Sequence, residues 1–310
     1  MEPRPDYIPH SQTGVSVLES RLMTDSTQRT SRIGRHLPTS GGLKNTLRTA
    51  EELGCETVQI FVSNPQGWAD ATPRPDAPAF REGKKRLGLF VAVHAKYLIN
   101  LASAREDHHE RSVRSLAAEL RAAGDLGADV VVVHSGSHGG DGEEAGAERL
   151  ISGLKRARNF AGDSAAEPVV ENSVGAGTQL CSTFETLAYV AERARVRVCV
   201  DTAHAFVAGY DLSTPESAIA VAGELREHLG DALAVLHLND ARNAFGSHRD
   251  GHERIGEGQV PEDSWPGVFA GIPGVPVVME TPFGMPEVDA EQVALVKRLA
   301  GGLPISVVGG

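Results

Sequence analysis

The sequence has few cysteines, and their spacing excludes a disulfide framework. Cys55, Cys181 and Cys199 form no C-x-x-C pair, and three widely spaced thiols fit a protein that keeps its cysteines reduced. The first 32 residues contain no apolar stretch followed by a small-residue cleavage site, so export is not expected. Together these absences predict a cytoplasmic protein.

Long apolar runs and an excess of positive charge are also missing. No segment approaches the ~18 consecutive apolar residues of a transmembrane helix. The formal net charge is −11, which argues against a protein that coats nucleic acid non-specifically. A local cationic site is still compatible with this charge, because bound metal ions are not included in it.

The chain has 310 residues, of which 41% are hydrophobic, so it can bury a large core. This length suits two ordinary domains or one α/β barrel of ~250 residues. Residues 1–32 are polar and irregular and predict a disordered extension, unless translation starts at Met23. We assign residues 33–303 to one domain and residues 304–310 to a C-terminal tail.

Short β-branched runs alternate with amphipathic segments along this domain. The runs cover residues 33–34, 57–62, 89–93, 130–133, 168–170, 196–200, 233–236 and 275–279. Apolar residues at helical spacing cover residues 41–53, 111–126, 214–229 and 291–299. Eight repeats of strand and helix predict a single (β/α)8 TIM barrel of the α/β class, with an open doubly wound sheet as the alternative.

A polar residue follows each of the eight runs. In order these residues are His36, Asn64, His94, His134, Glu171, Asp201, His237 and Glu280. In a parallel barrel these positions share the C-terminal rim of the strands. Three histidines, two glutamates and one aspartate among them are of the kinds that bind divalent metals, and His36 would add a seventh candidate. Carboxylates are not buried together without cations to balance them, which favours a metal site.

Two further clusters extend this set of candidate ligands. His204 lies three residues after Asp201, and Asp250 and His252 lie in a loop after the seventh run. Imidazole and carboxylate ligands without a thiolate suit zinc or manganese. The full set is too large for one ion and fits three; it consists of His94, His134, Glu171, Asp201, His204, His237, Asp250, His252 and Glu280.

In their order and composition, these motifs resemble the endonuclease IV family, the zinc-dependent (β/α)8 apurinic/apyrimidinic endonucleases of DNA repair. The resemblance runs from about residue 33 to residue 300. Its matching stretches are residues 33–36, 40–43, 64–68, 94–102, 134–138, 171–175, 201–211, 237–240, 245–252, 255–258 and 280–281.

The resemblance implies three zinc ions per chain. The first would be held by His94, His134 and Glu171; the second by Glu171, Asp201, His237 and Glu280; the third by His204, Asp250 and His252. It further implies cleavage of the phosphodiester 5′ to an abasic site in double-stranded DNA. From the chemistry of the site we expect attack by a metal-bound hydroxide, with Glu171 and Glu280 as the catalytic residues. The products would be a 3′-hydroxyl and a 5′-deoxyribose phosphate. We expect a monomer with no obligate protein partner and no membrane association.

Loops around the rim resemble the DNA-contacting loops of the family. They carry Tyr97, Asn64, Gln66 and Arg249, and we expect these four residues to contact DNA. Gln66 departs from the family because many members have an arginine there. Lys96 also departs, and it would either add a phosphate contact or be an ordinary surface residue.

Two other functions would use the same barrel or the same substrate. A sugar-phosphate isomerase or epimerase on the same barrel would hold one metal and would not need His94, His134, His204, Asp250 and His252. A DNA-lesion binding protein without activity would have lost a ligand, and none is lost here.

Overall fold

The computed structural model describes residues 31–301. The predicted extension at residues 1–32 lies outside this range except for Ser31 and Arg32, and the predicted tail at residues 304–310 lies wholly outside it. Among the described helices, none is both long enough and apolar enough to cross a membrane.

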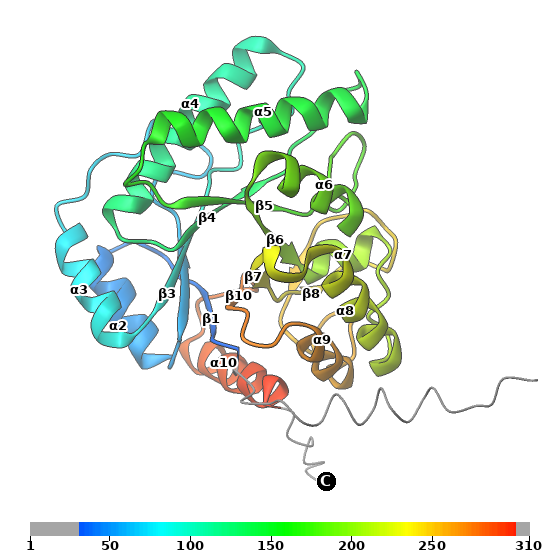
Figure 1. Ribbon diagram of the computed structural model, residues 1–310. Helices are drawn as coiled ribbons and strands as arrows, with labels where there is room; N and C mark the ends of the chain where they lie inside the picture. Colours follow the sequence, from blue (N-terminus) through cyan, green and yellow to red (C-terminus); the bar gives the residue numbers. More distant parts are fainter. Residues whose placement is uncertain (1–30, 302–310) are drawn as a thin grey trace, which may run out of the picture.

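Eight parallel strands close into a barrel, as the sequence predicts, and helices surround it (Figure 1). Around the barrel the strand order is β1-β10-β7-β6-β5-β4-β3-β2. The strands are β1 Ile33–His36, β2 Thr57–Ile60, β3 Phe90–His94, β4 Val130–His134, β5 Glu167–Glu171, β6 Arg197–Asp201, β7 Leu233–His237 and β10 Val277–Met279. Because β2 ends at Ile60, Asn64 belongs to the following loop and not to the end of a strand.

The helices pack outside the strands. They are α2 Leu43–Glu52, α3 Ala77–Leu87, α4 Glu106–Asp125, α5 Glu143–Ala161, α6 Phe184–Ala194, α7 Thr202–Ala208, α8 Pro215–Leu229, α9 Trp265–Gly271 and α10 Pro286–Ala300. The four predicted helical segments are confirmed as α2, α4, α8 and α10. At α8, the Thr214 side chain accepts a hydrogen bond from the Ser217 backbone at 3.1 Å, and Pro215 occupies the first turn. Two short strands, β8 Asp240–Ala241 and β9 His252–Glu253, form a separate hairpin after β7.

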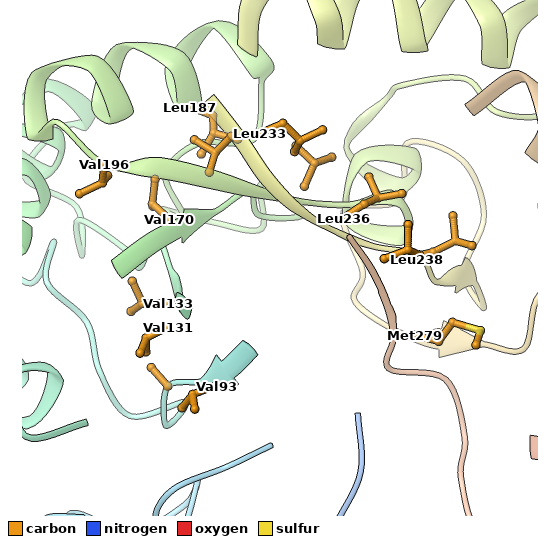
Figure 2. Close-up of a cluster of buried hydrophobic side chains, with 14 of the residues drawn as sticks. Val93, Val131, Val133, Val170, Leu187, Val196, Leu233, Leu236, Leu238 and Met279 are labelled. Atoms are coloured by element: carbon orange, nitrogen blue, oxygen red, sulfur yellow. The ribbon is translucent and has the colours of Figure 1, made fainter. Parts of the chain in front are cut away.

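The main hydrophobic core lies between the barrel and its helices. Figure 2 shows part of it, with side chains from several strands and from α6 in one cluster. The labelled members are Val93, Val131, Val133, Val170, Leu187, Val196, Leu233, Leu236, Leu238 and Met279. Continuous valine-rich strands are buried on both faces in this arrangement, which is why they lack the alternation of a half-exposed sheet.

Candidate metal centre

The alternation of the strands decides which side chains reach the mouth of the barrel. Side chains two residues apart on a strand point to the same face. A second, smaller cluster of buried residues, distinct from the main core, includes Ala92, Val132, Val169, Cys199, Val235 and Val278. Each of these residues precedes a predicted ligand by two positions, and the ligands in question are His94, His134, Glu171, Asp201, His237 and Glu280. The small side chains therefore form a floor inside the barrel, above which the ligands gather.

Glu171 lies at the centre of the predicted ligands. Its Oε2 is 3.5 Å from Nε2 of His94 and 3.5 Å from Nε2 of His134. These three residues can each offer one ligand atom such that all the atoms lie within 4.8 Å of one another. Glu171 and His94 are buried, whereas the His134 side chain is 40% exposed toward the mouth. The types of side chain in this group and the short distances between their ligand atoms are those of a metal site.

A second group shares Glu171 and adds Asp201, His237 and Glu280, again within 4.8 Å. His237 Nδ1 lies 3.2 Å from Glu171 Oε1 and 3.2 Å from Glu280 Oε2. Cys199 also lies beside Glu171 and His237. Burial raises the pKa of the Cys199 thiol to about 12, so this cysteine stays protonated at neutral pH.

The third group lies toward the loop between β8 and β9. Nε2 of His204 is 3.4 Å from Oδ1 of Asp250, and Nε2 of His252 is 3.5 Å from the same oxygen. Asp201 caps the N-terminus of α7 and accepts a hydrogen bond from the His204 backbone at 2.9 Å. The same aspartate lies 3.4 Å from His252 Nε2 through its Oδ2. Asp201 therefore joins the second and third groups, just as Glu171 joins the first and second.

The ionisable groups of the site differ in their affinity for protons. Burial alone would raise the pKa of Glu171, but the neighbouring His237 holds that pKa well below its ordinary value. Burial alone would lower the pKa of His204, but Asp201 and Asp250 raise it to about 10. Desolvation within the cavity, together with the neighbouring His94 and His204, lowers the pKa of His134 to about 4. In the metal-free protein at neutral pH, the Glu171 carboxylate is therefore ionised, His204 is protonated and His134 is neutral.

Two buried atoms of the site have no hydrogen-bond partner within the described residues. They are Oε2 of Glu171 and Nε2 of His252. A buried polar atom without a partner costs about 1–3 kcal/mol. Because both atoms face other ligand atoms at 3.4–3.5 Å, their missing partners are explained if they bind cations.

Neighbouring acceptors orient the imidazoles. Nδ1 of His94 lies 2.7 Å from the carbonyl oxygen of the next residue, and Nδ1 of His204 lies 3.0 Å from the Asn172 carbonyl. A carbonyl can only accept, so both rings carry a hydrogen on Nδ1, and Nε2 is the atom that can bind a metal once any proton on it has left. His237 has the opposite arrangement because its Nε2 lies 2.9 Å from Gln59 Oε1.

Two side chains that support the ligands were given no role from the sequence. Gln59 Nε2 donates to Glu280 Oε1 at 2.6 Å, so Gln59 contacts Glu280 as well as His237. Asn239 donates to Asp201 Oδ2 at 2.6 Å and accepts from the Glu280 backbone at 2.7 Å. The available signal was a polar residue at Gln59 within an apolar strand run, and a second polar residue two positions after His237.

A cavity of about 850 Å³ opens above these groups. Tyr97 lines it with an exposed ring, whose centroid is 5.4 Å from that of His94 and 5.8 Å from that of His134. His36 also lines the cavity, 3.8 Å from Glu280 Oε1, but it belongs to none of the ligand groups above. The mouth therefore presents an aromatic ring beside the first ligand group.

The other predicted DNA contacts lie farther out. Asn64 and Gln66 are exposed on the loop between β2 and α3, where Asn64 Oδ1 accepts from the Gln66 backbone at 3.0 Å. Arg249 is exposed on the loop between β8 and β9. None of these three side chains lines the described cavity, whose arginine is Arg242.

Comparison with known proteins places the chain in a family. The family model described as a xylose isomerase-like TIM barrel matches residues 47–298. A protein from Methanoculleus marisnigri described as a probable endonuclease 4 is 37% identical over 278 residues, which cover 87% of this chain and 99% of the relative. The crystal structure of endonuclease IV from Thermus thermophilus matches with a TM-score of 0.79 and 32% identity, covering 88% of this chain and 100% of that chain.

Sugar epimerases share the architecture at much lower identity. A D-tagatose 3-epimerase-like protein matches with a TM-score of 0.66 and 19% identity, covering 87% of this chain and 97% of that chain. At this identity the likeness is one of fold, and fold alone does not determine function. The sequence identity and coverage of the endonuclease relatives decide the family: the chain belongs to the endonuclease IV family.

Proposed function

We propose that this protein is a zinc-dependent apurinic/apyrimidinic endonuclease that acts on double-stranded DNA. It hydrolyses the phosphodiester on the 5′ side of an abasic site and leaves a 3′-hydroxyl and a 5′-deoxyribose phosphate. The observation that carries the proposal is the gathering of all nine predicted ligands into three adjoining groups at one mouth. A one-metal isomerase needs only the group around Glu171, Asp201, His237 and Glu280.

We assign each group one zinc ion. His94, His134 and Glu171 hold the first; Glu171, Asp201, His237 and Glu280 hold the second; His204, Asp250 and His252 hold the third. The mixture of imidazole and carboxylate ligands, with Cys199 protonated, fits zinc. When bound, the ions would supply positive charge for the phosphate and lower the pKa of water.

The protein side chains orient the reactants. Glu171 is central and ionised, so it is suited to accept a hydrogen bond from the attacking water and to align that water with phosphorus. The bond from phosphorus to the 3′-oxygen breaks, the water oxygen joins phosphorus, and a proton passes to the leaving oxygen. Glu280 is held beside His237 by Gln59 and the backbone contact to Asn239, which keeps the second group in place. No side-chain nucleophile is required.

The rim supplies the contacts with DNA. Tyr97 presents an exposed aromatic ring beside the mouth, and an abasic site lets such a ring enter the helix at little cost because one base is already missing. Asn64, Gln66 and Arg249 flank the mouth and would contact the two DNA strands. Three dications would outweigh the four ligand carboxylates, so the mouth would attract phosphate although the chain carries a net charge of −11.

All nine ligands come from one chain, so we propose a monomer. The enzyme would act in the cytoplasm, where its three cysteines stay reduced.

The direct test is incubation with a duplex oligonucleotide that carries one tetrahydrofuran abasic analogue. We expect a single nick 5′ to the analogue that survives mild EDTA, is lost after exhaustive chelation and returns when zinc is added. The matched duplex without the analogue should stay intact. Equal nicking of both duplexes would refute lesion specificity, and sugar isomerisation by a protein with one metal per chain would favour the isomerase alternative.

A further inference from the structure

A buried lysine lies directly beside the exposed Tyr97. The Lys96 side chain is inaccessible to solvent, and lysines are almost never fully buried unless they are paired. An inaccessible ammonium group cannot reach a DNA phosphate. The structure therefore contradicts both expectations for this position, an added phosphate contact and an ordinary surface residue.

The partners of Lys96 connect two loops of the mouth through α4. Its Nζ donates to the Ala69 carbonyl at 2.7 Å and lies 3.5 Å from Glu119 Oε1. Glu119, also buried, accepts from the Lys96 backbone at 3.1 Å through Oε2 and from the Ser63 hydroxyl through Oε1. One carboxylate on α4 thus binds the loop that carries Gln66 and the loop that carries Tyr97.

The first of these loops needs such restraints. Residues 61–76, between β2 and α3, contain no helix or strand, and a loop of this length has few contacts of its own to offset its conformational entropy. Its remaining ties also lead to the neighbouring segment. The Tyr97 backbone donates to the Pro65 carbonyl at 3.1 Å, and the Trp68 ring lies 4.4 Å from the Arg111 guanidinium on α4.

We propose that Lys96 and Glu119 are positioning residues that fix Gln66 and Tyr97 relative to each other, so that both loops meet the DNA as one surface. This inference rests on the proposed function, because it concerns the DNA contacts assigned there. A buried ion pair adds little net stability compared with apolar side chains of similar size. The effect of this pair is therefore expected on the geometry of the loops more than on folding.

The two charges are best removed together. Burial raises the pKa of Glu119, and replacing Lys96 alone would leave a buried acid without its cation. The test variant is Lys96→Met with Glu119→Gln. Lys84 offers a matched control, because its Nζ also donates to a carbonyl, that of Gly127 at 2.6 Å, and lies 2.8 Å from Asp129 Oδ2.

Lys84 lies on α3, and Asp129 lies directly before β4, at the end of the barrel opposite the mouth. Lys84→Met with Asp129→Asn should leave kcat and KM unchanged. Lys96→Met with Glu119→Gln should raise KM for the abasic duplex about tenfold and leave kcat within about threefold. Contacts that bind the substrate and the transition state equally affect KM and not kcat. A fall in kcat at unchanged KM, or no change in either constant, would overturn the proposal.

A second readout does not depend on activity. The chain has two tryptophans, and Trp265 is fully buried, so acrylamide quenching of fluorescence reports mainly on Trp68. We expect stronger quenching in the Lys96/Glu119 variant than in wild type or the Lys84/Asp129 control. Unchanged quenching would show that the pair does not hold the loop. If the wild type fails to cut the abasic duplex, the proposed function fails while this readout still decides whether the pair orders the loop.

A milder variant covers the case in which the double variant does not fold. Ser63→Ala removes only the hydroxyl that donates to Glu119. It should raise KM by about threefold and, like the double variant, make Trp68 fluorescence more strongly quenched than in wild type. Wild-type values for both quantities would contradict the proposal.

Discussion

Glu171, Asp201 and His237 are completely buried at the ends of strands, whereas Tyr97 and Arg249 are exposed on loops at the rim. The strand residues lie in a fixed parallel register, in which Asp201 pairs directly with His237. The loop residues depend on contacts that are particular to this chain. We therefore expect the strand ends to determine the chemistry and the loops to determine how DNA binds. Substitutions in the ligand groups should change kcat and metal binding, and substitutions in the rim loops should change KM.

The largest effect is expected from Glu171→Gln. The carboxylate belongs to two ligand groups, so its loss removes several kcal/mol of metal-dependent stabilisation. We expect kcat to fall by at least about 10³-fold, since each 1.36 kcal/mol is tenfold. Single-turnover cleavage of the abasic duplex measures this effect.

Glu167→Gln is the matched control. Glu167 lies on the same strand, β5, at its opposite end, where it pairs with Arg197 at 2.7 Å. Its substitution should leave cleavage unchanged. Equal losses in the two variants would show that the effect comes from damage to the strand and not from the ligand.

A smaller effect is expected at Gln59, which contacts two ligands without belonging to a ligand group. Gln59→Leu removes the acceptor for His237 and the donor for Glu280. Loss of such supporting contacts lowers metal affinity or activity by about 10–100-fold. Competition with a chromophoric zinc chelator measures the affinity, and a wild-type value would argue against a role for Gln59 in the metal centre.

The two histidines with opposite pKa shifts predict how zinc binding depends on pH. The pKa of His204 is raised to about 10 in the metal-free protein, so zinc must displace its proton, whereas His134, with a pKa lowered to about 4, is already neutral. Zinc affinity should therefore rise by up to about tenfold per pH unit between pH 7 and pH 9.

The titration of His204 also makes the stability of the metal-free protein depend on pH. The contribution of His204 to the free energy of unfolding is complete below its unfolded pKa of about 6.5 and is lost as pH rises toward 10.

Calorimetry in buffers of different ionisation enthalpy would detect the proton that His204 releases when zinc binds. The absence of proton release at pH 7.5 would contradict the assignment of His204 as a ligand.

The smallest effect is expected at the rim. Tyr97→Ala removes a ring that is already half exposed in the free protein, so we expect the lower limit of aromatic stacking, about 1 kcal/mol, or about a fivefold rise in KM. Tyr189→Ala is the control, because Tyr189 is similarly exposed on α6 and does not line the mouth. A fall in kcat for Tyr97→Ala would contradict the distinction between the ligand groups and the rim loops.

The sequence was sufficient to predict the strands and to place the candidate ligand residues at their ends. An apolar run followed by His, Asp or Glu fixes both the strand and the place of its last side chain, as at β4 with His134 and at β6 with Asp201. The two-residue period of a strand then determines that these side chains face inward.

The loops and supporting contacts could not be predicted in the same way. The sequence predicts a phosphate contact or a surface residue at Lys96, because its partners, Ala69 and Glu119, are distant in sequence. Gln59 showed only as a polar residue in an apolar run, and its contacts with His237 and Glu280 depend on the closure of the barrel. Such pairings arise from tertiary packing and leave no local pattern.

The most direct test of the central claim is a zinc count by elemental analysis of the purified protein, paired with anomalous diffraction at the zinc edge. We predict about three zinc ions per chain, with one peak within reach of His94 and His134, one beside His237 and Glu280, and one between His204 and His252. A single ion beside His237 and Glu280, in a protein that still cleaves the abasic duplex, would contradict the account.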